Sequence, residues 1–123
     1  MGTTRKTIFI LEDNDDIREL ISILLMEEDY EVKGYPTVKS FTQVMQFAHP
    51  DMIVLDVMLG DGNGIKVCDD LKNNLRTQDI PILMMSANTD YRCIKNNCSA
   101  EDFISKPFDI NDFVNKVDHH LRA

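Results

Sequence analysis

The chain has few cysteines, few basic residues and no long apolar run. Its three cysteines are an odd number without CxxC spacing, which argues against a disulfide framework or a zinc site and favours a reducing compartment. No apolar run approaches the length of a membrane span, and the N-terminus lacks the apolar segment of a signal peptide. These absences predict a cytoplasmic protein that does not contact membranes.

The charge balance argues against a nucleic-acid-binding protein. Lys and Arg number 13 against 21 Asp and Glu, so the net charge is −8. A surplus of acid repels phosphate backbones and argues against direct binding of DNA or RNA. The pair His119-His120 has no partner pattern nearby, and we expect a surface role for it rather than metal binding.

Length and apolar content predict one folded domain over residues 1–123. The chain is too short for two comfortable domains, and 43% of its residues are apolar, which is enough for a core. We find no internal repeat, low-complexity segment or interdomain linker.

Apolar runs alternate along the chain with segments of helical periodicity. We expect strands at residues 6–11, 31–35, 52–55 and 80–85, with a short fifth strand around 103–104. We expect helices from 14 or 15 to about 29, from near 37 to 48, from 65 to beyond 71, and from about 110 to 121. Glycines at 60, 62 and 64 mark a loop between the third strand and its helix.

This alternation predicts an α/β fold. Strands that are apolar on both faces indicate a parallel sheet covered by helices on both sides. Five such units in this length suit a doubly wound, flavodoxin-like (βα)5 fold with strand order 2-1-3-4-5. In that fold ligands bind beyond the carboxyl ends of the strands, between strands one and three.

Polar residues gather at that predicted edge. Glu12 and Asp13 follow the first strand, and Asp56 ends the third. Ser86 and Lys106 follow the fourth and fifth strands. Each residue alone has an ordinary structural explanation, such as a loop acid or a surface lysine. All five at one edge of the sheet favour a functional site.

Three carboxylates in one pocket need a cation or a proton. Two unit charges 4 Å apart repel by about 4 kcal/mol at an effective dielectric of 20. Carboxylate oxygens and open coordination positions suit Mg²⁺. With a lysine and a hydroxyl added, the set is typical of a phosphoryl-transfer site. The next acids, Asp15 and Asp16, are better explained as the first turn of a helix, where the helix dipole favours negative charge.

The chain resembles a response-regulator receiver domain over essentially its whole length. The residues that carry the resemblance are Glu12-Asp13 after the first strand, Asp56 in "IVLDVML", Ser86-Ala87 after "ILMM", and Lys106-Pro107-Phe108 in "DFISKPF". Their order and spacing make a more specific signal than any one motif.

The resemblance implies a phosphoacceptor and a metal site. Asp56 would accept a phosphoryl group from a phosphohistidine. Glu12, Asp13, Asp56 and the backbone carbonyl of Met58 would surround Mg²⁺. A glutamate at position 12, where relatives often carry aspartate, has a longer arm that reaches the metal through water.

The resemblance also implies a switch. Lys106 would pair with the phosphoryl oxygens, Ser86 would turn toward the phosphoryl group, and Phe103 would occupy the aromatic switch position. The Lys106-Pro107 bond is a candidate cis peptide.

The implied partners are proteins. The donor would be a sensor histidine kinase or a histidine phosphotransfer protein, and the output would pass to a downstream protein target or to an output domain outside this sequence. The chain would catalyse its own phosphorylation and dephosphorylation at Asp56, without turnover of an external substrate.

Two departures from the family pattern stand out. Gly60 occupies the place where relatives usually carry a proline after the acceptor, so the glycine-rich loop is expected to be more mobile. The segment 89–100 lacks a strong helical stripe, so we expect the fourth helix to be short, shifted or partly melted.

The main alternative is a receiver-fold adaptor that binds proteins without being phosphorylated. A cofactor binder of the flavodoxin type would need a phosphate-cradling loop after the first strand, where this chain has "EDNDD". A calcium loop starting at Asp61 would place Lys72 where a bidentate glutamate is required.

Overall fold

The computed structural model of the chain describes residues 5–87 and 99–122. Its main sheet has five strands in the order β2-β1-β3-β6-β7. All four neighbouring pairs in this sheet are parallel. The strands are β1 (Thr7–Leu11), β2 (Glu31–Tyr35), β3 (Met52–Asp56), β6 (Ile82–Ser86) and β7 (Asp102–Ser105). Since β4 and β5 form a separate hairpin, the predicted order 2-1-3-4-5 is confirmed.

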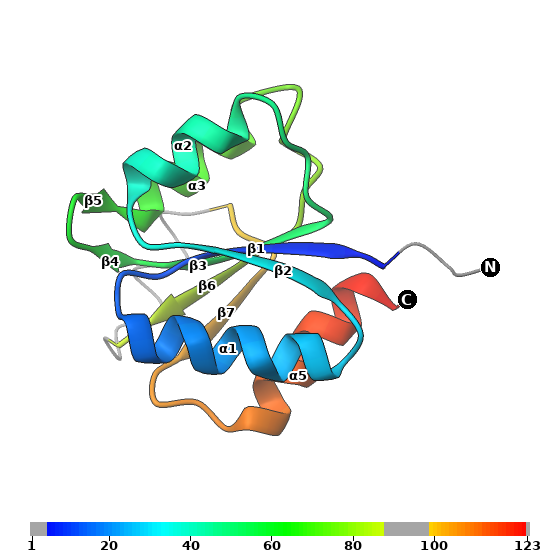
Figure 1. Cartoon of the computed structure of the whole chain (residues 1–123). Helices are drawn as coiled ribbons and strands as arrows, with labels where there is room; N and C mark the ends of the chain where they lie inside the picture. Colours follow the sequence, from blue (N-terminus) through cyan, green and yellow to red (C-terminus); the bar gives the residue numbers. More distant parts are fainter. Residues whose placement is uncertain (1–4, 88–98, 123) are drawn as a thin grey trace.

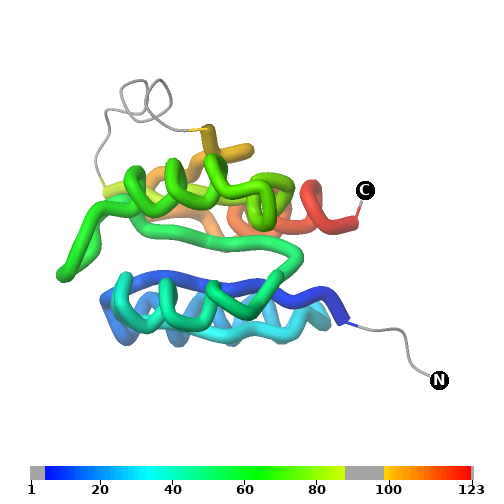
Figure 2. Tube along the Cα trace, turned by 90° about the horizontal axis from the view of Figure 1, so that it is seen from above, coloured from blue at the N-terminus to red at the C-terminus, as the bar shows by residue number. Residues whose placement is uncertain are grey.

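Helices cover both faces of this sheet, as predicted (Figure 1). On one face lie α1 (Asp15–Glu27) and α5 (Ile110–Leu121). The other face carries α2 (Val38–Met45) and α3 (Gly64–Lys72). Seen from above, α2 lies on the side of β1 and α3 on the side of β6 (Figure 2).

Burial explains why the central strands read as continuous apolar runs. Every residue of β3 and of β6 is buried, because helices pack on both of their faces. By contrast β2 is an edge strand without a fully buried residue, and its sequence alternates polar and apolar residues. The strand pattern in the sequence therefore reports position in the sheet.

The helices begin at side chains that accept hydrogen bonds from their first turns. Asn14 caps α1 by accepting from the Ile17 amide, and Asp15 and Asp16 form its acidic first turn, as predicted. Asp109 caps α5 in the same way.

The glycine-rich segment differs from the expected loop. It contains a small antiparallel hairpin of β4 (Met58–Leu59) and β5 (Gly62–Asn63). Gly64 then begins α3, where an added Cβ would lie 2.0 Å from the Asp56 carbonyl oxygen. Only glycine permits this approach of α3 to the end of β3.

Two other expectations concern the end of the chain. The Lys106-Pro107 peptide bond is cis. The predicted weak helix at 89–100 lies almost wholly outside the described residues, which resume at 99.

Within the described residues, no helix combines the length and the apolar character needed to cross a membrane.

Candidate functional site

The carboxyl ends of four neighbouring strands bring the predicted residues together, at the left of Figure 1. Glu12 and Asp13 follow β1, and Asp56 is the last residue of β3. Ser86 ends β6, and Lys106 directly follows β7. Because the strands are parallel and adjacent, residues far apart in the sequence meet at one edge of the sheet.

Three carboxylates form the centre of this edge. One oxygen each of Glu12, Asp13 and Asp56 lies within 4.8 Å of the others. Glu12 and Asp56 are 1% and 5% exposed, whereas Asp13 is exposed to solvent. Within residues 5–87 and 99–122, this is the one group of three or more His, Cys, Asp and Glu side chains close enough to hold a metal ion.

Lys106 supplies the positive charge that faces these acids. Its Nζ lies 2.5 Å from Glu12 Oε1 and 3.1 Å from Asp56 Oδ2. Its backbone amide donates to the Ser86 carbonyl at 2.7 Å, which holds the backbone of Lys106 at the end of the sheet. Burial by itself lowers the pKa of Lys106, but the hydrogen bonds and charges of Glu12 and Asp56 outweigh it and raise that pKa. The ammonium therefore stays charged at neutral pH.

Glu12 is held in place by both its side chain and its backbone. Burial raises the pKa of its carboxyl, although the hydrogen bonds from Lys106 and from the Asn14 amide oppose the shift. The Asn14 amide donates to Oε2 at 3.1 Å, and the Glu12 amide donates to the Tyr35 carbonyl at 3.1 Å. The acid that follows β1 is thus a fixed part of the site.

Sequence reasoning missed Arg18. One of its guanidinium nitrogens donates to the Glu12 carbonyl at 2.8 Å, and another pairs with Asp15 at 2.6 Å. The aliphatic part of the Arg18 side chain passes beside Gly34, where an added Cβ would lie 3.0 Å from Arg18 Cγ. Arg18 lies three residues after Asp15 on α1, and that spacing signals the ion pair alone. Its contact with the Glu12 carbonyl required the structure.

The predicted switch residues lie at or beside the site. Ser86 is 5% exposed, and Phe103 is 9% exposed within the core under α2 and α3. Phe103 pairs with Met84 across β6 and β7, so it is linked to the strand that ends at Ser86. The switch roles implied by the family pattern remain predictions.

Met58 begins the hairpin two residues after Asp56. Its side chain is 72% exposed, and it pairs with Asn63 across β4 and β5. Between Asp56 and Met58, the Val57 amide donates to the Met85 carbonyl at 2.9 Å and holds the chain against the sheet. The Met58 carbonyl remains the predicted fourth ligand.

The donor set fits Mg²⁺. Carboxylate oxygens are its preferred ligands, and it keeps several waters, so three clustered carboxylates beside open solvent suffice. Among the described residues, no His or Cys belongs to the group, which disfavours zinc. The cation would also relieve the repulsion that Lys106 balances in part.

Known proteins resemble the chain over most of its length. The family model described as "Response regulator receiver domain" matches residues 8–118. The phosphate regulon transcriptional regulatory protein PhoB of Pseudomonas aeruginosa is 34% identical over 119 residues, 95% of this chain and 52% of that protein. The chain spans about half the length of the curated relatives it matches.

Solved structures share the fold. The signal receiver domain of a signal transduction histidine kinase from Syntrophus aciditrophicus has a TM-score of 0.89 at 25% identity, covering 95% of this chain and 90% of that one. The receiver domain of a sensor histidine kinase from Pseudomonas aeruginosa, with a magnesium ion coordinated in its active site cleft, has a TM-score of 0.87 at 18% identity. That likeness covers 98% of this chain and 100% of the other, and at this identity it shows the fold alone.

Proposed function

Because the chain belongs to the response regulator receiver domain family, we propose that Asp56 accepts a phosphoryl group from a phosphohistidine donor. The observation that carries this proposal is the convergence on Asp56 of two further carboxylates and of the Lys106 ammonium, 3.1 Å away. Isolated acids at strand ends are common, but a buried acid between a lysine and a carboxylate cluster is typical of phosphoryl transfer.

The metal-binding part of the proposal assigns Glu12, Asp13, Asp56 and the Met58 carbonyl to Mg²⁺. The clustered oxygens support the first three, and the position of Met58 two residues after the acceptor supports the fourth. When bound, Mg²⁺ supplies positive charge that offsets the carboxylates and the oxygens of the incoming phosphoryl group.

The transfer is one substitution at phosphorus. An oxygen of Asp56 forms a bond to phosphorus while the phosphorus–nitrogen bond of the donor breaks. The electron pair of that bond stays on the imidazole nitrogen, which then takes a proton from solvent. Attack of water on phosphorus later releases inorganic phosphate and restores the Asp56 carboxylate.

The neighbouring side chains bind and orient the phosphoryl group. Lys106 pairs with its oxygens, since Nζ already contacts the acceptor carboxylate and is charged at neutral pH. The Ser86 hydroxyl turns toward a phosphoryl oxygen and donates to it. Fixed charges that need no rearrangement during the reaction account for most of the catalysis.

The added charge then changes protein contacts. Movement of Ser86, with Phe103 following on the adjacent strand, biases a two-state arrangement of the loops around the site. The proposed donor is a sensor histidine kinase or a histidine phosphotransfer protein, in the cytoplasm. The proposed recipient is a downstream protein or an output domain, because relatives such as the DNA-binding response regulator MtrA of Mycolicibacterium smegmatis are about twice as long as this chain.

The test is to incubate the protein with Mg²⁺ and acetyl phosphate and to measure its intact mass. We expect one acid-stable, base-labile phosphoryl adduct, which is absent with EDTA and absent in Asp56→Asn. The matched control is Asp70→Asn, which removes an exposed carboxylate on α3 and leaves the site intact. If wild type gains no adduct from acetyl phosphate or from a phosphohistidine protein, the chain is a binding adaptor instead.

A further inference from the structure

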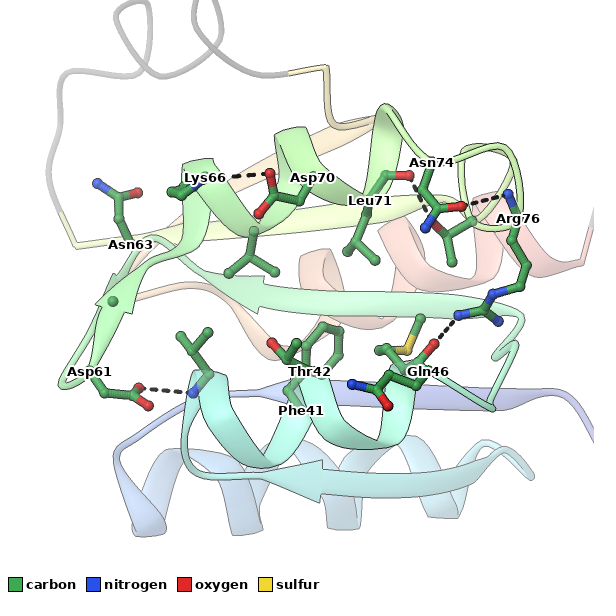
Figure 3. A pocket seen from close by; sticks show the side chains of 15 residues that line it. Phe41, Thr42, Gln46, Asp61, Asn63, Lys66, Asp70, Leu71, Asn74 and Arg76 are labelled. Atoms are coloured by element: carbon green, nitrogen blue, oxygen red, sulfur yellow. Dashed lines mark hydrogen bonds and ion pairs between the residues drawn. The ribbon is translucent and has the colours of Figure 1, made fainter.

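The hairpin that follows Asp56 is attached to the N-terminus of α2 by one carboxylate. Asp61 lies at the turn between β4 and β5. Its Oδ1 accepts from the Val38 amide at 2.8 Å, and its Oδ2 accepts from the Lys39 amide at 3.2 Å. Figure 3 shows the carboxylate directed at the start of α2.

Asp61 accepts hydrogen bonds from the first-turn amides of α2 that the helix's own N-cap residue leaves without a partner. The first amides of a helix have no partner within it, and the helix dipole favours negative charge there. Thr37 accepts from the Ser40 amide, which leaves the amides of Val38 and Lys39 to Asp61. These hydrogen bonds lower the pKa of Asp61, the bond from Val38 most of all. The carboxylate is therefore charged whenever the protein is near neutral pH.

The hairpin is also fixed where it leaves the sheet. The Gly64 amide donates to the Val57 carbonyl at 2.8 Å, which closes the base of the hairpin beside Asp56. Near the tip, an added Cβ at Gly62 would lie 3.0 Å from Val38 Cγ2, so hairpin and helix touch directly. The segment that contains Met58 is thus held at its base by the sheet and at its tip by α2.

We propose that Asp61 is a positioning residue for the acceptor site: by capping α2 it holds the Met58–Asn63 segment beside Asp56 in the arrangement that binds Mg²⁺. This inference rests on the proposed function, because it assumes that the Met58 carbonyl is a metal ligand. Asp61 contacts neither Asp56 nor the reacting atoms. It acts through the backbone of the hairpin, and it couples the start of α2 to the phosphoacceptor.

The chemistry of the cap predicts a graded series of variants. A carboxylate offers an acceptor oxygen to each of the two amides, an amide side chain offers one oxygen, and alanine offers none. Asp61→Asn should therefore keep part of the cap, whereas Asp61→Ala should lose all of it. The matched control is Asp70→Ala. Asp70 and Asp61 both line the groove between α2 and α3, but Asp70 pairs with Lys66 and not with the start of α2 (Figure 3).

The experiment measures three quantities on each variant. Hydrogen exchange at Val38, Lys39 and Asn63 reports the cap and the hairpin. A titration with Mg²⁺, monitored through the amide chemical shifts of the protein, gives the dissociation constant for Mg²⁺ without any phosphodonor. The rate of adduct formation from acetyl phosphate reports the reaction. Asp61 is exposed, so all variants should fold, which circular dichroism checks.

We expect Asp61→Ala to speed exchange at all three amides, to weaken Mg²⁺ binding by about tenfold because the backbone that carries a proposed ligand is no longer held, and to slow adduct formation. Asp61→Asn should fall between Asp61→Ala and wild type, and Asp70→Ala should match wild type. The inference is overturned if Asp61→Ala loses protection at Val38 and Lys39 while its Mg²⁺ affinity equals that of Asp70→Ala.

The two proposals fail in different ways. If wild type binds Mg²⁺ but gains no adduct, the proposed function fails, and the Mg²⁺ titration of the variants still decides the role of Asp61. If wild type gains the adduct and Asp61→Ala equals it in affinity and rate, the positioning role alone fails. If wild type does not bind Mg²⁺ at all, both fail.

Discussion

The two faces of the sheet are packed in different ways. Under α1 and α5 the core is closed, with Ile21, Leu25, Phe113 and Val117 at zero exposure. A hollow of about 420 Å³ beside α5 is lined only by polar side chains outside this core: Asp102, Asp112, Asn115, Lys116 and His119. Between α2 and α3 the other face contains a groove with a cavity of about 390 Å³ (Figure 3). Phe41 and Leu71 line this groove as well as the core beneath it.

The polar contacts of the two faces differ accordingly. On the closed face, the Tyr30 hydroxyl donates to Asp118 at 2.5 Å and accepts from Arg122 at 2.9 Å, which ties the end of α1 to the end of α5. On the grooved face, α2 is held at its two ends. Asp61 caps its start, and Arg76 donates to the carbonyls of Met45 and Ala48 near its end.

The two faces of the sheet therefore support the site in different ways. Both faces bury the strands whose carboxyl ends form the site, but the closed face does so without a groove that reaches the core. The grooved face borders the hairpin that follows Asp56. Its helix α2 packs on the core through Phe41 and Met45 and is also held by hydrogen bonds at both ends. Changes on the closed face should therefore lower the free energy of unfolding most, and changes on the grooved face should have smaller effects on stability.

The largest expected effect compares two buried phenylalanines. Phe113→Ala on the closed face should lower the free energy of unfolding by about 3–5 kcal/mol, because the cavity it leaves is fully enclosed. Phe41→Ala should cost about 3 kcal/mol, the low end of that range, because the space it leaves joins the groove and can fill with water. Urea unfolding measures both. Equal losses, or a larger loss for Phe41→Ala, would contradict the distinction between the faces.

The next effect concerns the end of α2. Arg76→Ala removes the donor to the Met45 and Ala48 carbonyls, and we expect a loss of about 1–2 kcal/mol in the free energy of unfolding. Arg76→Lys should retain part of this, since an ammonium reaches fewer acceptors in a fixed geometry. Faster hydrogen exchange should be confined to α2, and spread of the effect to α1 would show that the two faces are not independent.

A smaller effect tests the contact that ties α1 to α5. Tyr30→Phe should lower the free energy of unfolding by about 1 kcal/mol at neutral pH. Burial, together with the neighbouring Asp118, raises the pKa of Tyr30 from 10.0 to about 12. A raised pKa means that the contribution is complete below pH 10 and is lost as the pH rises through 12. Unfolding of wild type and Tyr30→Phe should therefore converge in alkali, which urea titrations at neutral and alkaline pH will test.

The smallest effect concerns Asp102, the first residue of β7, whose contribution to stability should be lost in acid. Burial alone raises the pKa of Asp102, but the hydrogen bonds from the Phe103 amide and His120, with the charge of Lys116, outweigh it and lower that pKa. Its contribution is therefore present above pH 3.8 and is lost as the pH falls below that value. Asp102→Asn should cost less than about 1 kcal/mol at neutral pH and nothing in strong acid. A cost that persists in acid would show that the charge is irrelevant.

Much of the fold could be predicted because its signals are local. The apolar runs that became β1, β3 and β6 and the periodic face of α5 need no distant partner to be recognised. The hairpin could not be predicted in this way, because strands of two residues have no period. Nor could the Arg18 contact with the Glu12 carbonyl, which depends on how α1 leaves the sheet and on the space beside Gly34.

The sequence by itself determined which residues end the strands, and therefore that Glu12, Asp13, Asp56, Ser86 and Lys106 share one edge of a parallel sheet. Only the tertiary structure decided how they meet. Lys106 lies between acids 94 and 50 residues away, and Asp61 caps a helix that begins 23 residues earlier in the chain. The physical reason is the separation along the chain between the residues that interact. Strand and helix patterns follow from neighbouring residues, whereas a hydrogen bond across the fold depends on the register and packing of every element between its partners.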